Sequence, residues 1–155
     1  MSDTPMLRLR RAAALAIVTA LWCWLLTAAH GIWSLGLERG YLDGGRIPLY
    51  PSLPVTYGSF FIDSFSALFI TFLFAFGMSA VLPRTYHLPS ACIAWGVGAY
   101  IGLSGIAFVY QIDFGTTFAP FEATRALILH PFVTPVWLVL GIAGTAFLTV
   151  PFRKT

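Results

Sequence analysis

Charged side chains are scarce in this chain, since Asp, Glu, Lys and Arg together make up only 10% of its 155 residues. A soluble globular domain carries about 25% charged residues, because its surface must be wetted. The shortage excludes an ordinary soluble domain. It also excludes a disordered chain, which needs low hydrophobicity and high net charge. The sequence has no dense basic stripe with interleaved aromatic residues, so nucleic acid is excluded as a partner.

Cysteine is also rare, and only Cys23 and Cys92 are present. Both fall in apolar runs without a second cysteine or a histidine at ligand spacing, so neither a disulfide framework nor a zinc site is expected. The sequence contains no G-x-S-x-G, H-E-x-x-H or Walker loop and no paired aspartates within an apolar run. We therefore expect no catalytic activity from this chain on its own.

What the chain has in abundance is apolar side chains, which make up 58% of its residues and give a mean hydropathy of +0.82. A membrane-spanning helix needs about 20 consecutive apolar residues. The segments that meet this length are residues 12–35, 60–82, 90–111 and 131–150. The sequence predicts an all-α membrane protein, a single domain of four transmembrane helices packed as an antiparallel bundle.

Short connections complete the expected organisation. They are an outer loop (36–59), an inner hairpin (83–89), a second outer loop (112–130) and a cytoplasmic tail (151–155). Pro83 and Pro89 bracket the hairpin. Pro131 suits the first turn of a helix, where its missing N–H would have had no partner.

The first outer loop contains Pro48, Pro51 and Pro54, whose spacing of three is the period of polyproline II. A stiff strip of this kind could dock a partner, although a loop that merely returns across the bundle can have the same composition. The second outer loop contains a run, 121–129, that predicts a short amphipathic helix in the membrane interface.

Basic residues near the segment ends predict the orientation. With both termini inside, the cytoplasmic side carries Arg8, Arg10, Arg11, Arg84, Arg153 and Lys154, and only Arg39, Arg46 and Arg125 lie outside. This asymmetry is typical of a multi-pass protein of a bacterial inner membrane. The basic start and Thr27-Ala28-Ala29 also resemble a signal peptide with its cleavage site. The apolar run is too long for that and contains Trp22 and Trp24, so an uncleaved anchor is favoured.

Ionisable residues in or beside a membrane span are costly and therefore candidates for function. His30, Asp63, Asp113 and His130 all lie toward the outer side, so they could converge there in a bundle. We take His30, Asp63 and His130 as the candidate cofactor-binding residues, for haem b, a divalent metal or a quinone. The simpler interpretation needs no cofactor: the histidines lie in the headgroup layer and Asp63 caps a helix N-terminus. His87, in the inner hairpin, is expected to contact lipid phosphate.

Small and aromatic residues recur at helical spacing and predict helix packing. The expected interface comprises a small-residue face and a phenylalanine stripe: Ala94, Gly98, Gly102, Gly105 and Gly141, with Phe61, Phe65 and Phe69. Small residues let helix backbones approach closely, and the rings suit either a small-residue groove or lipid.

These features favour a small accessory or structural subunit of a larger inner-membrane complex. It would contact the lipid bilayer and other integral membrane subunits through its glycine-rich face and outer loops, without a cofactor. Two alternatives stay open. One is an electron-transfer subunit with a haem, metal or quinone site near the outer face, and the other is a small subunit of a multicomponent transporter.

Overall fold

The computed structural model describes residues 5–43, 54–114, 118–119 and 122–154. Throughout these ranges the regular structure is helical, with no strand. Four helical spans are long and apolar enough to cross a membrane: Pro5–Leu37, Tyr57–Val81, Arg84–Phe114 and Val133–Phe152. The all-helical prediction is therefore confirmed, together with the expected set of candidate membrane spans.

The helices and turns follow one another along the chain with short breaks. In order they are α1 (Pro5–Gly31), the π-helical η1 (Ile32–Leu37), α2 (Tyr57–Asp63), α3 (Phe65–Val81), the 3-10 turn η2 (Arg84–Tyr86), α4 (His87–Tyr110), η3 (Gln111–Phe114), α5 (Glu122–Leu127) and α6 (Val133–Lys154). Of the prolines expected in a stiff outer strip, Pro48 and Pro51 lie outside the described residues.

Helix ends differ from the limits of the apolar runs. α1 begins at Pro5 and so includes the arginine-rich segment before residue 12. Arginine is a good helix former, but a search for apolar residues alone does not detect a helical segment rich in it. α6 continues through Pro151 to Lys154, where the sequence suggested a tail. Pro131 lies in a turn before α6, and Pro135 occupies its first turn instead, where the missing N–H has no intrahelical partner.

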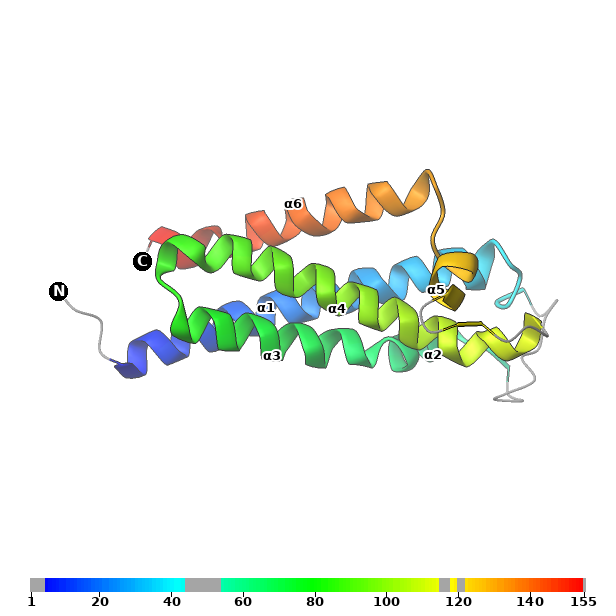
Figure 1. The fold of residues 1–155 in the computed structure, drawn as a ribbon, viewed down its shortest axis with the longest axis horizontal. Helices are drawn as coiled ribbons and strands as arrows, with labels where there is room; N and C mark the ends of the chain where they lie inside the picture. Colours follow the sequence, from blue (N-terminus) through cyan, green and yellow to red (C-terminus); the bar gives the residue numbers. More distant parts are fainter. Residues whose placement is uncertain (1–4, 44–53, 115–117, 120–121, 155) are drawn as a thin grey trace.

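The long helices lie lengthwise beside one another (Figure 1). The start of α1, the α3–α4 hairpin and the end of α6 lie at one end, which we call the hairpin end; η1, α2, η3 and α5 lie at the other, the loop end. α3 packs against both α1 and α4, and α6 packs on α1 and α4 from outside. Only 17% of the most apolar stretch of α6 is buried, compared with 44% for the corresponding stretches of the α1 and α4 spans.

The second span is interrupted at Ser64, which separates α2 from α3. Its hydroxyl donates a hydrogen bond to the Phe60 carbonyl at 2.7 Å, a local bond that competes with regular helix geometry. α2 begins at Tyr57, where the Thr56 backbone N–H donates to Ser59 Oγ at 3.2 Å. Asp63 therefore lies at the end of α2 and does not cap the start of a helix. The expectation of a cap was wrong, because the helix begins well before the apolar run does.

The glycine face of α4 packs inside the bundle. A Cβ atom on Gly102 would lie 2.5 Å from the Ala67 Cβ of α3, and one on Gly105 would lie 2.8 Å from the Asp63 carbonyl oxygen. A Cβ on Gly98 would overlap Thr71. These positions allow α3 and α4 to approach closely.

Two other small residues of the expected interface are also covered. Ala94 is fully buried in a cluster with Leu15, Ala75 and Ala91, and Gly141 of α6 lies under the Trp95 ring of α4. Both positions therefore contribute to contacts within the chain.

The phenylalanine stripe does not face these glycines. Phe65 and Phe69 are each 54% exposed, although Phe61 and Phe65 also contact Trp24 edge-on, with ring centroids 5.6 and 6.2 Å apart. α3 instead turns a different face inward, made of the buried small residues Ala67, Thr71, Ala75 and Ser79. Close backbone approach needs small residues on both helices, so the rings point away from the α3–α4 contact.

Candidate functional site

Two tyrosine–aspartate pairs meet at the loop end of the bundle. The Tyr41 hydroxyl donates to Asp113 Oδ2 at 2.8 Å, and the Tyr110 hydroxyl lies close to the Asp63 carboxylate. The two tyrosine rings contact each other edge-on, with centroids 4.9 Å apart, and they are only 2% and 1% exposed. The four residues come from the turn after η1, from α2, from α4 and from η3, so this cluster ties four segments together.

Aromatic and aliphatic side chains surround this cluster. Tyr110 stacks on Phe60, with centroids 5.6 Å apart, and both rings belong to a buried cluster that also contains Leu35, Ile106 and Leu127. In apolar surroundings a hydrogen bond to a charged carboxylate contributes about 1.5–3 kcal/mol. The two pairs therefore hold the loop end closed.

His30 links α1 to α6. Its side chain is only 3% exposed, and its ring stacks on Trp137 of α6 with centroids 5.8 Å apart and planes inclined by 16°. Its Nε2 atom lies 3.5 Å from Thr134 Oγ1, and the ring lies near the backbone of Ile128. Every one of these contacts is made within the chain.

His130 caps the start of α6. Its Nδ1 atom accepts hydrogen bonds from the backbone N–H groups of Phe132 and Val133 at 3.2 and 3.3 Å, satisfying donors that lack intrahelical partners. The backbone N–H of His130 donates to Thr134 Oγ1 at 2.8 Å, and its ring contacts Trp33 edge-on with centroids 5.5 Å apart. Thr134 therefore contacts both histidines.

The predicted cofactor residues are divided between two places. His30 and His130 approach the same threonine, whereas Asp63 lies beside Tyr110. No set of three His, Cys, Asp or Glu side chains suited to a metal ion occurs among the residues that the structure describes. The amphipathic run 121–129 contains α5, which buries Ala123, Thr124 and Leu127 and leaves Glu122 and Arg125 exposed.

A small cavity lies beside His30, between α1, α4 and α6. Its walls include Thr27, His30, Trp95, Thr134 and Trp137, and its volume is about 30 Å³. One water needs about 10–15 Å³ of such volume, so the cavity has room for about two waters. A quinone ring or a porphyrin would fit only if α6 moved away from α1 and α4.

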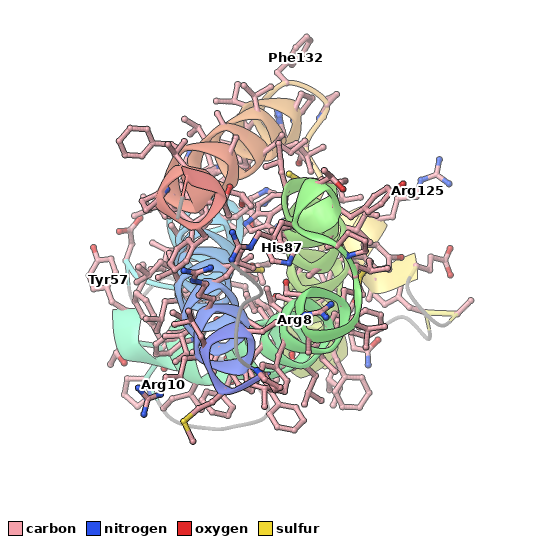
Figure 2. All side chains as sticks on the ribbon, turned by 90° about the vertical axis from the view of Figure 1, so that its left-hand side faces the viewer. Arg8, Arg10, Tyr57, His87, Arg125 and Phe132 are labelled. Carbon is pink, nitrogen blue, oxygen red and sulfur yellow. The ribbon has the colours of Figure 1, made fainter. Side chains whose placement is uncertain are left out.

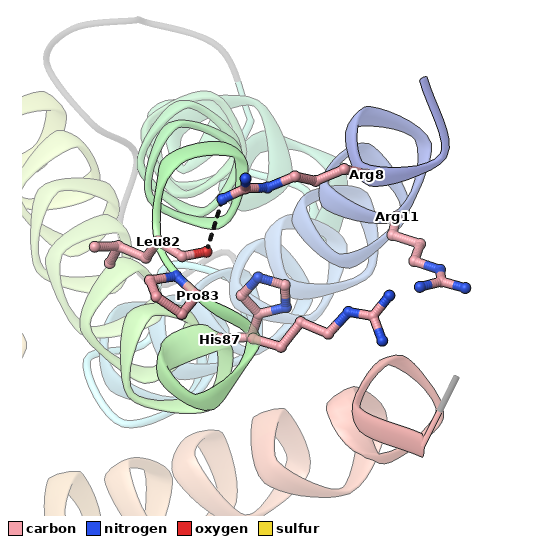
Figure 3. A pocket seen from close by; sticks show the side chains of 6 residues that line it. Arg8, Arg11, Leu82, Pro83 and His87 are labelled. Carbon is pink, nitrogen blue, oxygen red and sulfur yellow. Dashed lines mark hydrogen bonds between the residues drawn. The ribbon is translucent and has the colours of Figure 1, made fainter. Parts of the chain in front are cut away.

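A larger pocket of about 380 Å³ opens at the hairpin end (Figures 2 and 3). It is lined by Arg8, Arg11, Leu82, Pro83, Arg84 and His87. Arg8 donates from Nη2 to the Val81 and Leu82 carbonyls at 2.8 and 3.3 Å, so it caps the last turn of α3. His87, the first residue of α4, is 7% exposed.

Sequence reasoning missed several of these residues. Tyr41 and Tyr110 were not considered, although Tyr110 and Asp63 both lie at the ends of the two hairpin-linked runs away from the hairpin, which is a usable signal for a pair. Thr134 and Trp137 follow His130 at helical spacing, but nothing in the sequence indicates that His30 joins them.

Comparison with models of protein families, with curated proteins and with solved structures gives no match for this chain. The fold and the site define a class: a helical protein with four candidate membrane spans whose polar side chains join its helices at the loop end. A more particular role has to be argued from the geometry.

Proposed function

We propose that this chain is a small, non-catalytic accessory subunit of a larger complex of the bacterial inner membrane. In this proposal the four candidate spans cross the membrane as an antiparallel bundle, with both termini in the cytoplasm and α5 at the outer interface. The main support for a structural role is that the ionisable side chains at the loop end are engaged in contacts within the chain. His30, Asp63, His130 and Asp113 each engage a partner within the chain, and these contacts join helices or cap them.

The packing of the glycine face of α4 changes where a partner subunit could bind. Gly98, Gly102 and Gly105 lie against α3, so they are not accessible to another subunit unless the bundle opens. A partner would therefore bind a different surface, together with the outer loops.

α6 is the helix best suited to carry that surface. Its fully buried positions form a narrow stripe of small residues, Gly141, Thr145 and Thr149, four residues apart, and Thr134 and Trp137 contact His30 near its start. The rest of the helix exposes large apolar side chains: Val136, Leu138, Val139, Leu140, Ile142, Phe147 and Val150. Lipid offers little hydrophobic drive for helix association, so a helix held by so narrow a contact gains stability when a partner helix packs on its open side.

The test is purification of the tagged chain from its native membrane in a mild detergent, followed by mass spectrometry and an absorbance spectrum. One variant, Ala143→Trp, places a large ring on the exposed side of α6. The matched control, Gly77→Trp, places the same ring on an exposed position of α3, where an added Cβ meets no atom within 4 Å.

The proposal expects stoichiometric integral membrane partners with the unaltered chain and with Gly77→Trp, and their loss with Ala143→Trp. Partners that survive both substitutions would refute docking through α6. An unaltered chain without partners would refute the accessory role. A Soret band or a bound quinone that disappears with His30→Ala would replace it with electron transfer.

A further inference from the structure

The pocket at the hairpin end collects positive charge from separate parts of the chain. Arg8 and Arg11 lie one turn apart on α1, Arg84 belongs to η2, and His87 begins α4. Figure 2, viewed from this end, places Arg8 and His87 between the helices, whereas Arg10 points outward. Figure 3 shows the same side chains around the opening, with Leu82 and Pro83 as its apolar wall.

The start of α4 adds to this positive charge. Tyr86, the N-cap residue, makes no side-chain hydrogen bond to the helix. The N-terminus of a helix carries a partial positive charge. A negatively charged group at this position would meet both the arginines and the helix end.

No acidic side chain of the described part of the chain lies at this end. The acids in the described ranges belong to α2, η3, α5 and the segment after η1, all at the loop end: Glu38, Asp43, Asp63, Asp113 and Glu122. Asp3 lies outside the described residues. Among the described residues the pocket therefore gathers positive charge, which suits an anionic ligand.

We propose that this pocket binds the phosphate group of an anionic phospholipid. The guanidinium fork matches phosphate oxygens, and Arg8, Arg11 and Arg84 line the pocket, so these guanidinium groups would contact the headgroup. Basic pockets between transmembrane helices are a known form of lipid headgroup site.

A lipid is favoured over a soluble phosphate compound because of where the pocket lies. Its walls are the ends of three candidate spans, and so its opening faces the headgroup layer. Next to it, Leu9 of α1 and Val81 of α3 expose apolar side chains, 50% and 76% exposed, along which acyl chains would lie. The proposal does not depend on an accessory role, since binding is measured on the isolated chain.

The experiment is native mass spectrometry of the full chain in detergent, titrated with phosphatidylglycerol and, separately, with phosphatidylcholine. The pocket variant is Arg11→Gln with Arg84→Gln. The matched control is Arg10→Gln with Arg125→Gln, which removes the same charge from two exposed arginines outside the pocket. One arginine near a lipid surface contributes about fivefold in affinity, so the pocket variant is expected to bind phosphatidylglycerol about 25-fold more weakly.

The control variant is expected to weaken binding less than the pocket variant, because Arg125 lies at the other end of the molecule and Arg10 points away from the pocket. Equal losses in both variants would overturn the proposal in favour of non-specific charge attraction. Equal affinity of the unaltered chain for the two lipids would overturn it too.

A further arm distinguishes the source of the phosphate. Inorganic phosphate at millimolar concentration is added to the lipid-loaded chain, and it is expected to leave the lipid bound. Displacement of the lipid by phosphate, with the same arginine dependence, would overturn the lipid assignment. The single variant Arg84→Gln leaves the Arg8 cap of α3 in place and is expected to lose about fivefold, so the proposal stays testable if the double variant unfolds.

Discussion

The contact between α3 and α4 can be tested by adding one methyl group. In Gly98→Ala, the new Cβ overlaps the Thr71 hydroxyl and lies 3.0 Å from both the Ala67 carbonyl oxygen and the Thr71 Cβ. Thr71 is buried and β-branched, so its side chain has few other rotamers available. The helices must therefore move apart, and their other close contacts weaken.

The expected cost is that of overpacking a well-packed interior, about 2 kcal/mol. Gly96→Ala is the matched control, because it lies on the same helix and an added Cβ there meets no atom within 4 Å. Alanine is about 1 kcal/mol more favourable than glycine in a helix interior, so the control is expected to be neutral or stabilising. The two substitutions are chemically identical and differ only in what lies opposite them.

Thermal unfolding in a mild detergent, followed by tryptophan fluorescence, measures the difference. A cost of about 2 kcal/mol corresponds to a Tm lower by about 4–8 °C. Thr71→Ala combined with Gly98→Ala removes the overlapping hydroxyl and is expected to recover about 1 kcal/mol of that cost. If Gly98→Ala unfolds at the temperature of Gly96→Ala, the close approach of α3 and α4 is refuted.

Two other predictions address the loop end and the orientation. Tyr41→Phe removes the 2.8 Å hydrogen bond to Asp113 and is expected to cost about 1.5–3 kcal/mol, seen as a lower Tm; an unchanged Tm would mean that the pair does not hold the loop end. For the orientation, single cysteines at exposed Arg10 and Arg125, in a chain whose two native cysteines are replaced by serine, are labelled on intact cells with a membrane-impermeant maleimide. Labelling at 125 but not at 10 is expected, and the reverse pattern would contradict the positive-inside argument.

Much of the secondary structure could be predicted because it depends on local properties. A chain in lipid must satisfy its backbone hydrogen bonds internally, and a helix does so within one segment, so a long apolar run is enough to indicate a helix. The limits of the runs were less informative, since the arginine-rich start of α1 is helical without being apolar, and Ser64 interrupts the second span through its bond to Phe60. These departures come from single polar side chains that average hydropathy does not register.

The candidate site was only partly predictable. The loop-end position of His30 and His130 follows from their places at the ends of apolar runs, and both do reach Thr134. Asp63 lies at the same end but pairs with Tyr110, because the direction in which a side chain points depends on the rotation of its helix. That rotation is decided by packing.

Sequence alone therefore determined that this is a helical chain with four candidate membrane spans and basic residues gathered near particular helix ends. These properties depend on composition and on contacts within a few residues. Only the tertiary structure decided which faces meet: that Gly98 and Gly102 lie against the small residues of α3, that Phe65 and Phe69 point outward, and that α6 buries only a narrow stripe of its surface. The physical reason is that helices in lipid pair through the fit of their surfaces, and fit is a property of two helices together.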